Sequence, residues 1–190
     1  MSSKRAKASV SKGSTRITRC RGCGAESLVR VVDLGTQHLT GVFPEKKNAE
    51  VSKGPLRLVW CSGCNLVQLD SSYDLSEMYG ANYGYRSGLN RSMVQHLSDK
   101  CHALEKMARL KSADLVLDIG SNDGTFLRSY RTPGLKKVGI DPSAGKFRKY
   151  YDSDSQLIVD FFTRDKIKSE LGEAAQASLI TSIAMFYDLE

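Results

Sequence analysis

The chain has 190 residues, of which 41% are hydrophobic and 26% charged, as in a globular protein with one medium domain or a small domain plus part of another. The sequence has no apolar run near the roughly 20 residues that cross a bilayer, and no secretory signal at its N-terminus. We therefore expect a soluble, cytoplasmic protein, while the basic, acid-free N-terminus is also compatible with an organelle-targeting peptide.

The net charge of +7 is concentrated at the N-terminus. Seven of the 28 Lys and Arg residues precede Glu26, the first acid, so the other basic residues equal the 21 Asp and Glu in number. Residues 1–19 are almost devoid of apolar side chains and cannot offset the entropy of ordering, which predicts a disordered, solubilising tail. Nonspecific anion binding is an alternative, but the neutral body argues against a specific nucleic-acid partner.

Four of the five cysteines form two Cys-x-x-Cys pairs. They are Cys20, Cys23, Cys61 and Cys64. Such pairs are typical of a structural zinc ion held by four thiolates, and Gly22, Gly24 and Gly63 suit the tight turns because glycine tolerates a positive φ. Two disulfides are disfavoured in a reducing compartment, and neither pair opens a βαβ unit as a redox motif would. Cys101 falls at an apolar position of a predicted helix and is expected in the core.

Short strands are predicted around the cysteine pairs, at residues 28–34, 56–60 and 66–69. Together they indicate a small, zinc-ribbon-like module over residues 20–72. The following segment, 73–111, contains half of the tyrosines of the chain and an amphipathic helix that begins near Leu89.

Tyr83, Tyr85 and Arg86 stand close together in this connecting segment. The aromatic rings could pack a seam between two domains. Alternatively, they could form a substrate wall, in which rings stack on a sugar or base and Arg86 binds a phosphate.

A βαβ pattern begins with a buried strand at residues 114–120. The turn Gly120-Ser121-Asn122-Asp123-Gly124 follows it, and a helix is expected to begin near residues 125–127. A second strand, 137–140, ends at Asp141, about 20 residues after the turn, where an acid can bind both ribose hydroxyls of a nucleoside.

The acids around this turn favour a cationic ligand. A dinucleotide pyrophosphate requires a loop without anions, because helix N-terminal amides face its phosphates. Here Asp118 and Asp123 flank the turn, which suits the ammonium and sulfonium groups of S-adenosylmethionine (SAM). Purely structural packing of the strand and helix is the alternative.

The βαβ pattern continues with a third strand at 156–159, a helix at 163–171 and a fourth strand at 178–183. Asp160 and Phe161 follow the third strand, where an acid and an aromatic ring can receive the adenine amine and ring. The predicted fold is thus α/β, with the zinc module followed by part of a doubly wound, Rossmann-like parallel sheet over residues 112–190.

Several motifs resemble those of the zinc-containing, SAM-dependent C-methyltransferases that act on nucleotide-linked keto-deoxysugars. Besides the cysteine pairs and the cofactor loop 117–124, the matching segments are Val32-Asp33-Leu34-Gly35, Leu66-Val67-Gln68-Leu69, Tyr83-Gly84-Tyr85-Arg86-Ser87 and Gly139-Ile140-Asp141-Pro142-Ser143. The resemblance implies a class I methyltransferase fold, a nucleotide-sugar substrate, and methylation of the enolate formed next to a sugar ketone.

The resemblance also implies roles for tyrosines. Those matching Tyr83 and Tyr85 line the sugar site in that family, and Tyr187 stands where members can carry a histidine, so it is the candidate catalytic residue. Family members continue into further strands and a C-terminal domain, so we expect a partial chain without turnover by itself.

Two other functions are compatible with the sequence. The cysteine module and basic tail suit a zinc-ribbon nucleic-acid methyltransferase or RNA- or DNA-binding protein, but the segment after the fourth strand lacks the Asn/Asp-Pro-Pro-aromatic motif of base N-methyltransferases. A noncatalytic interaction protein with a vestigial cofactor fold is the other alternative.

Overall fold

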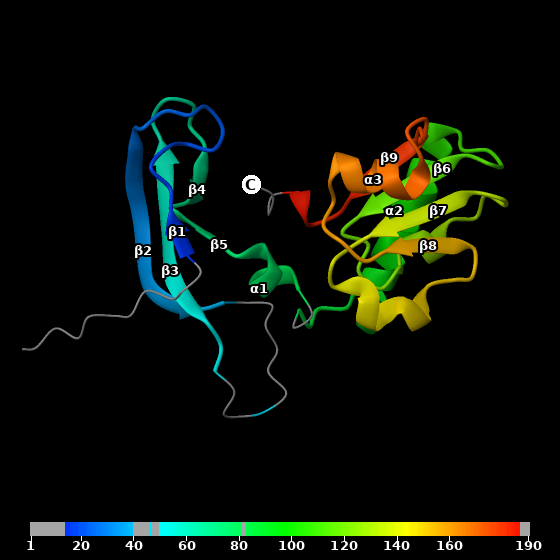
Figure 1. Ribbon diagram of the computed structural model, residues 1–190, viewed down its shortest axis with the longest axis horizontal. Coiled ribbons are helices and arrows are strands. Elements are labelled where there is room, and N and C mark those ends of the chain that lie inside the picture. The colour runs from blue at the N-terminus through cyan, green and yellow to red at the C-terminus, as the bar shows by residue number, and fades with distance from the viewer. Residues whose placement is uncertain (1–13, 40–45, 47–49, 81–82, 187–190) are drawn as a thin grey trace, which may run out of the picture. The chain divides into compact units, whose positions relative to one another are not determined.

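The computed structural model describes residues 14–39, 46, 50–80 and 83–186 (Figure 1). These residues form two units, divided between Gly84 and Tyr85. The predicted connector 73–111 is therefore shared by both units. In the part of the chain that the structure describes, no helix is long and apolar enough to cross a membrane.

The first unit consists of two small antiparallel sheets. One contains β1 (Ser14–Arg16) and β5 (Ser71–Tyr73), and the other has the order β2-β3-β4 (Leu28–His38, Lys53–Cys61 and Val67–Leu69). The short helix α1 (Leu75–Tyr79) follows. The three predicted strands are confirmed, and the first two are longer than expected.

Part of the predicted disordered tail is ordered in the structure. Residues 14–16 form β1 because their backbone pairs with β5, and Arg16 lies 3.6 Å from the buried carboxylate of Asp70. Residues 1–13 lie outside the described residues.

The second unit is built on a parallel sheet with the strand order β8-β7-β6-β9. Its strands are β6 (Leu115–Ile119), β7 (Lys136–Ile140), β8 (Ser155–Ile158) and β9 (Leu179–Ser182). The chain proceeds outward from β6 to β8 and then returns to the other side of β6, so the strand order reverses between β6 and β9. In open α/β sheets, ligands bind at such a switch point, outside the carboxyl ends of the strands.

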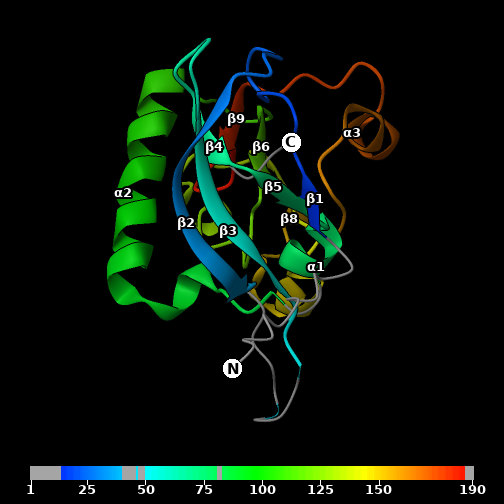
Figure 2. The same ribbon diagram turned by 90° about the vertical axis from the view of Figure 1, so that its left-hand side faces the viewer.

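Helices cover both faces of this sheet (Figure 2). On one face, α2 (Arg91–Ala108) packs through Leu97 and Cys101 against Phe126. On the other face, α3 (Arg164–Leu171) packs through Ile167 and Leu171 on a core from β6, β7 and β8. The Rossmann-like parallel sheet that the sequence predicted is therefore present in the described part of the chain.

The helix expected after the cofactor loop is much shorter than predicted. Only a single 3₁₀ turn forms there, η2 (Leu127–Ser129), and Tyr130 is already extended. Pro133 and Gly134 follow immediately, and β7 begins at Lys136, so the connection leaves no room for a longer helix. The other 3₁₀ segments of this unit are η1 (Ser87–Leu89) and η3 (Ala144–Tyr150).

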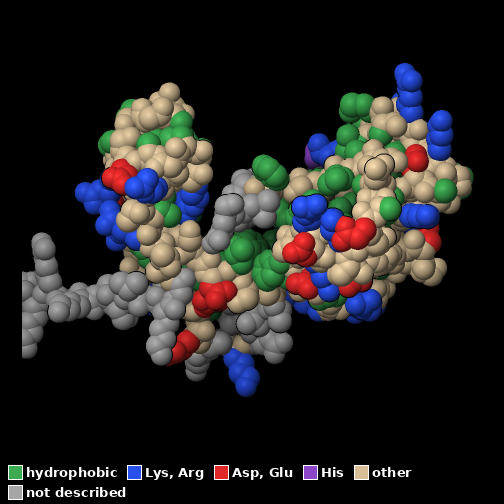
Figure 3. All heavy atoms as spheres, turned by 45° about the horizontal axis from the view of Figure 1, so that its top comes forward, with side chains coloured by type: hydrophobic (Ala, Val, Ile, Leu, Met, Phe, Trp, Pro, Cys, Tyr) green, Lys and Arg blue, Asp and Glu red, His purple; other side chains and the backbone are tan. Residues whose placement is uncertain are grey.

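Charged side chains of both signs are mixed on the face of the second unit that Figure 3 shows. Ion pairs account for part of this mixing. Lys166, for example, lies 2.9 Å from Glu170 and 3.4 Å from Asp160. Positive and negative side chains are therefore interspersed on this face.

Gly139 provides a test of how closely the cofactor loop packs on the sheet. A Cβ atom at this position of β7 would lie 2.5 Å from Ser121 Oγ and 2.9 Å from Leu127 Cδ1. We expect Gly139→Ala to lower the free energy of unfolding by about 1–3 kcal/mol, as overpacked cores do, measured by urea denaturation. Gly145→Ala is the control, since its Cβ would meet Val159 at an ordinary 3.4 Å. Equal losses in the two variants would contradict this expectation.

Candidate metal centre and cofactor loop

The four paired cysteines converge on one point of the first unit. Cys20 and Cys23 lie in the turns between β1 and β2, while Cys61 ends β3 and Cys64 lies in the turn before β4. The sheet register brings the two turns together, because Leu28 of β2 pairs with Cys61. All four Sγ atoms lie within 4.8 Å of one another.

This thiol cluster fits a tetrahedral zinc ion. The Sγ atoms of Cys20 and Cys64 are 3.6 Å apart, and those of Cys23 and Cys61 are 3.7 Å apart. Zinc–sulfur bonds of about 2.3 Å in a tetrahedron require separations of about 3.8 Å. All five cysteines are free of disulfide bonds. The predicted structural zinc site is confirmed as a closed set of four thiols.

Hydrogen bonds and crowding act on the pKa values of these thiols in opposite directions. The amide of Cys23 and the side chain of Gln68 lower the pKa of Cys20 to about 6. The Leu66 amide lowers the pKa of Cys64, but the neighbouring thiols outweigh it and raise the pKa to about 12. Four thiolates at these distances repel one another, and a divalent cation offsets that repulsion.

The glycines near the cysteines serve two different purposes. The sequence analysis expected a positive φ at all three glycines. Only Gly24 has one, at +74°, so the expectation is wrong for Gly22 and Gly63. At Gly22 and Gly63 the benefit is small size, because a Cβ would lie 3.2 Å from Leu66 Cδ2 and 3.3 Å from Ala25 Cβ, respectively.

The cofactor loop of the second unit has an unusual backbone. Gly120, Asn122 and Gly124 all have positive φ values, of +74°, +49° and +72°. The first glycine also lacks space for a side chain, since a Cβ would lie 3.1 Å from Met185 Cγ. A Cβ at Gly124 would lie 3.2 Å from the Tyr151 ring. Both glycines are therefore required by conformation and by space.

Asp141 connects this loop to the end of β7. Its Oδ2 accepts a hydrogen bond from the Asn122 amide at 2.9 Å, and its Oδ1 accepts from the amide and hydroxyl of Ser143 at 2.7 Å each. Asp141 is 7% exposed. Because each carboxylate oxygen has two lone pairs, Asp141 keeps capacity for one more donor at Oδ2 when only the described residues are counted.

The two acids that flank the loop both contact protein groups. Asp118, inside β6, is 4% exposed and accepts a hydrogen bond from Thr181 Oγ1 at 2.7 Å. Burial, with a smaller contribution from the charge of Asp141, raises the pKa of Asp118 to about 7, although the hydrogen bond from Thr181 acts in the opposite direction. Asp123 is fully buried, with its Oδ2 3.0 Å from Arg86 Nε and its Oδ1 accepting from the hydroxyl of Thr125 at 2.6 Å.

Asp160 and Phe161 lie just beyond the carboxyl end of β8. Asp160 Oδ1 accepts a hydrogen bond from the Phe161 amide at 2.8 Å, and its Oδ2 is 3.4 Å from Lys166 Nζ. The Asp141 amide donates to the carbonyl of Ile158, so the ends of β7 and β8 are adjacent. Asp160 and Asp141 therefore lie at the same edge of the sheet.

The candidate substrate residues are divided between the two units. Tyr83 belongs to the first unit, where its ring meets that of Tyr79 edge-on at a centroid distance of 5.6 Å. Tyr85 and Arg86 belong to the second unit, and the Tyr85 carbonyl accepts a hydrogen bond from Asn122 Nδ2 at 3.0 Å. Tyr187, the candidate catalytic residue, lies outside the described residues.

Comparison with known proteins agrees with this geometry. Residues 20–79 match a family described as "putative zinc binding domain". Over 159 residues, 83% of the chain, the sequence is 30% identical to the C-methyltransferase NovU of Streptomyces niveus. The chain is therefore similar to a C-methyltransferase over most of its own length, and its cysteine region is similar to a zinc-binding domain. The matched region spans 36%, about a third, of the length of NovU.

Sequence analysis missed three contact residues of the metal centre and the cofactor loop. Gln68 Nε2 donates to Cys20 Sγ at 3.1 Å, and its Oε1 accepts from the Arg21 amide at 3.1 Å. Tyr151 Oη lies 2.8 Å from Ser121 Oγ and donates to the Asn122 carbonyl at 2.9 Å. Tyr150 contacts Arg86. A polar Gln68 within a short apolar strand was a usable signal, whereas nothing local marked the tyrosines.

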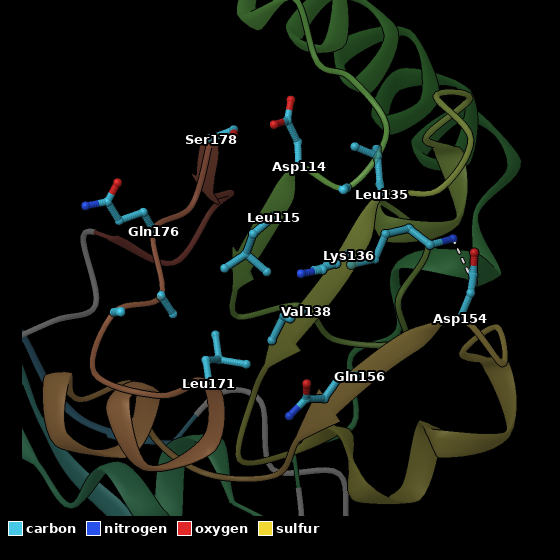
Figure 4. Close-up of a pocket in the computed structure, with 14 residues that line it drawn as sticks. Asp114, Leu115, Leu135, Lys136, Val138, Asp154, Gln156, Leu171, Gln176 and Ser178 are labelled. Atoms are coloured by element: carbon cyan, nitrogen blue, oxygen red, sulfur yellow. Dashed lines mark ion pairs between the residues drawn. The ribbon is translucent and has the colours of Figure 1, made fainter.

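A hollow of about 580 Å³ lies at the end of the parallel sheet opposite the cofactor loop (Figure 4). It is lined by apolar side chains such as Leu115, Val138 and Leu171, and by polar ones such as Gln156. Leu115 and Gln156 stand at the amino ends of β6 and β8, Val138 lies in the middle of β7, and Leu171 ends α3. Because α/β sheets bind ligands at the carboxyl ends, we assign no cofactor to this hollow.

We expect the purified chain to contain about one zinc ion, since four thiolates complete one tetrahedral site. Cys61→Ser removes one thiolate and should lower the zinc content well below that of the wild type, measured by elemental analysis after dialysis. Cys101→Ser is the control, because Cys101 is buried in the second unit and is not one of the four clustered thiols. Unchanged zinc in Cys61→Ser would count against the site.

The raised pKa of Asp118 predicts a dependence of stability on pH. An acid with a higher pKa in the folded than in the unfolded protein destabilises the fold as pH rises from about 4 to about 7, and the effect is constant above that range. Asp118→Asn should therefore become more stable than the wild type across this interval, by up to roughly 4 kcal/mol. Urea denaturation at several pH values measures the difference. Asp99→Asn, which removes an exposed carboxylate on α2, is the control, and equal pH responses of the two variants would contradict the expectation.

Proposed function

We propose that this chain provides the zinc module and the SAM-binding loop of a methyltransferase that C-methylates a nucleotide-linked keto-deoxysugar. The observation that carries the proposal is the hydrogen bond from the Asn122 amide to Asp141, which joins a glycine loop after β6 to an acid after β7. This arrangement stands beside the switch point between β6 and β9, where ligands of such sheets bind.

The loop suits a nucleoside without phosphates. A pyrophosphate is usually bound by the N-terminal amides of a helix, but the loop here leads only into the 3₁₀ turn η2. Asp141 offers the spare acceptor capacity of its Oδ2 to one ribose hydroxyl. We assign the ribose of SAM to Asp141. The methionine part of SAM is assigned to the loop Gly120-Ser121-Asn122-Asp123-Gly124, with Asp118 beneath this loop.

The adenine base is assigned to the next strand end. Asp160 is half exposed and can accept a hydrogen bond from the adenine amine, while the adjacent Phe161 presents an aromatic ring. The hydrogen bond between the Asp141 amide and the Ile158 carbonyl holds the ribose and adenine positions side by side at one edge of the sheet.

The proposed reaction transfers a methyl group to carbon. A base removes the proton from the carbon next to the sugar ketone, and the electron pair of the broken C–H bond forms an enolate. The enolate carbon then bonds to the methyl group, and the electrons of the sulfur–methyl bond remain on sulfur, so that a neutral thioether leaves. Tyr83, Tyr85 and Arg86 are proposed for the sugar side of the site, and Tyr187 as the candidate acid or base.

Isothermal titration with S-adenosylhomocysteine (SAH) tests the cofactor assignment. Asp141→Asn replaces the carboxylate that accepts a hydrogen bond from the Asn122 amide and, in this proposal, from a ribose hydroxyl. We expect its affinity for SAH to fall about 10- to 100-fold, the effect of losing one charge-assisted hydrogen bond. Gln156→Ala, at the other end of the sheet, should bind SAH as the wild type does.

The opposite result would reject the assignment. If Gln156→Ala weakened SAH binding and Asp141→Asn did not, the ligand would occupy the hollow at the amino ends of the strands. Binding of NAD in place of SAH would reject the choice of cofactor.

A further inference from the structure

We propose that Asp123 is a positioning residue, which clamps the segment Tyr85–Gly88 onto the cofactor loop through Arg86 and does not contact the cationic centre of the methyl donor. The inference rests on the proposed function, because it concerns the loop assigned there to SAM. It changes the part that Asp123 and Arg86 play in that site.

Two consecutive loop residues hold four consecutive residues of the upstream segment. Asp123 Oδ2 lies 3.0 Å from Arg86 Nε and accepts the Gly88 amide at 3.0 Å. Asn122 Oδ1 accepts the Ser87 amide at 3.0 Å, and Asn122 Nδ2 donates to the Tyr85 carbonyl at 3.0 Å. Three of these four contacts are made to backbone atoms of the segment, so they fix the path of its backbone directly.

The Arg86 guanidinium is directed at protein groups. It lies 4.0 Å from the centre of the Tyr150 ring, and its Nη1 donates to the Tyr150 hydroxyl at 2.8 Å. Only 23% of the Arg86 side chain is exposed. Stacking on a ring while bridging a carboxylate and a hydroxyl needs the planar fork of arginine, which lysine lacks.

The charge of Asp123 is balanced inside this network. Its side chain is fully buried, and it faces a guanidinium, two backbone amides and the Thr125 hydroxyl. A carboxylate paired in this way exerts little net attraction on a second cation. Close packing supports the same view, because a Cβ at Gly88 would lie 2.5 Å from Asp123 Oδ2.

The clamp couples the two parts of the proposed site. The segment that it holds contains Tyr85 and Arg86, assigned to the sugar side, and the loop that holds it is assigned to SAM. Any displacement of residues 122–123 therefore displaces the backbone at Tyr85. We infer that Asp123 acts on the substrate side of the site by setting the place of this segment.

SAM and SAH distinguish a positioning role from a direct one, because SAM carries the sulfonium charge and SAH does not. Titrations of the full chain compare the wild type with Asp123→Asn and Arg86→Gln. We expect both variants to bind SAM and SAH about tenfold more weakly, with the ratio of the two dissociation constants unchanged within about twofold. A selective loss of SAM affinity in Asp123→Asn would show direct contact with the cation and overturn the proposal.

Amide hydrogen exchange provides a readout that needs no ligand. In Arg86→Gln and Asp123→Ala, we expect faster exchange at the amides of Ser87 and Gly88, while Val138 in the centre of β7 remains protected. Unchanged exchange at Ser87 and Gly88 would overturn the clamp. Failure of the wild type to bind either ligand would reject the proposed function instead, and the exchange result would still decide the structural part of the inference.

Discussion

The hydrogen bond between the Asn122 amide and the Asp141 carboxylate is the contact on which the geometry of the second unit depends. Parallel pairing places Ile119 opposite Ile140, so the loop after β6 begins beside the end of β7. The Gly120 amide donates to the Ile140 carbonyl, and two residues later the Asn122 amide reaches the carboxylate. These bonds hold a backbone that turns through left-handed conformations at residues 120, 122 and 124. The loop is thus defined by the neighbouring strand as much as by its own glycines.

In the first unit, a metal site compensates for a small apolar core. Four apolar side chains of its described residues are almost fully buried, and two of these belong to the cluster. They are Cys20, Leu39, Val59 and Cys61. Most of β2 is exposed, including Val29 and Val31. A core this small contributes little hydrophobic stabilisation, and zinc binding adds folding free energy directly. The unit should therefore lose its fold when the metal is removed.

The features that the sequence predicted well are local ones. The buried strands appear as apolar runs, the cysteine pairs have a fixed spacing, and the glycines at 120 and 124 stand where the backbone requires them. The partners of Asp123 were not predictable, because Arg86 is 37 residues away along the chain. The short helix after the loop was predictable in principle, since Pro133 and Gly134 in the sequence leave room for only one turn. Gln68 reaches Cys20 because β4 pairs with β3, a contact across 48 residues.

The three acids around the loop show why counting charges is a poor guide to ligand preference. Burial favours the neutral form of Asp118 and raises its pKa to about 7. Asp123 is fully buried and lies 3.0 Å from Arg86 Nε. Asp141 differs from both, because it stands at the end of a strand and its Oδ2 accepts a single hydrogen bond from the described residues. In the function proposed above, this remaining acceptor capacity selects for a nucleoside at the loop. The other two acids determine the shape of the loop that presents it.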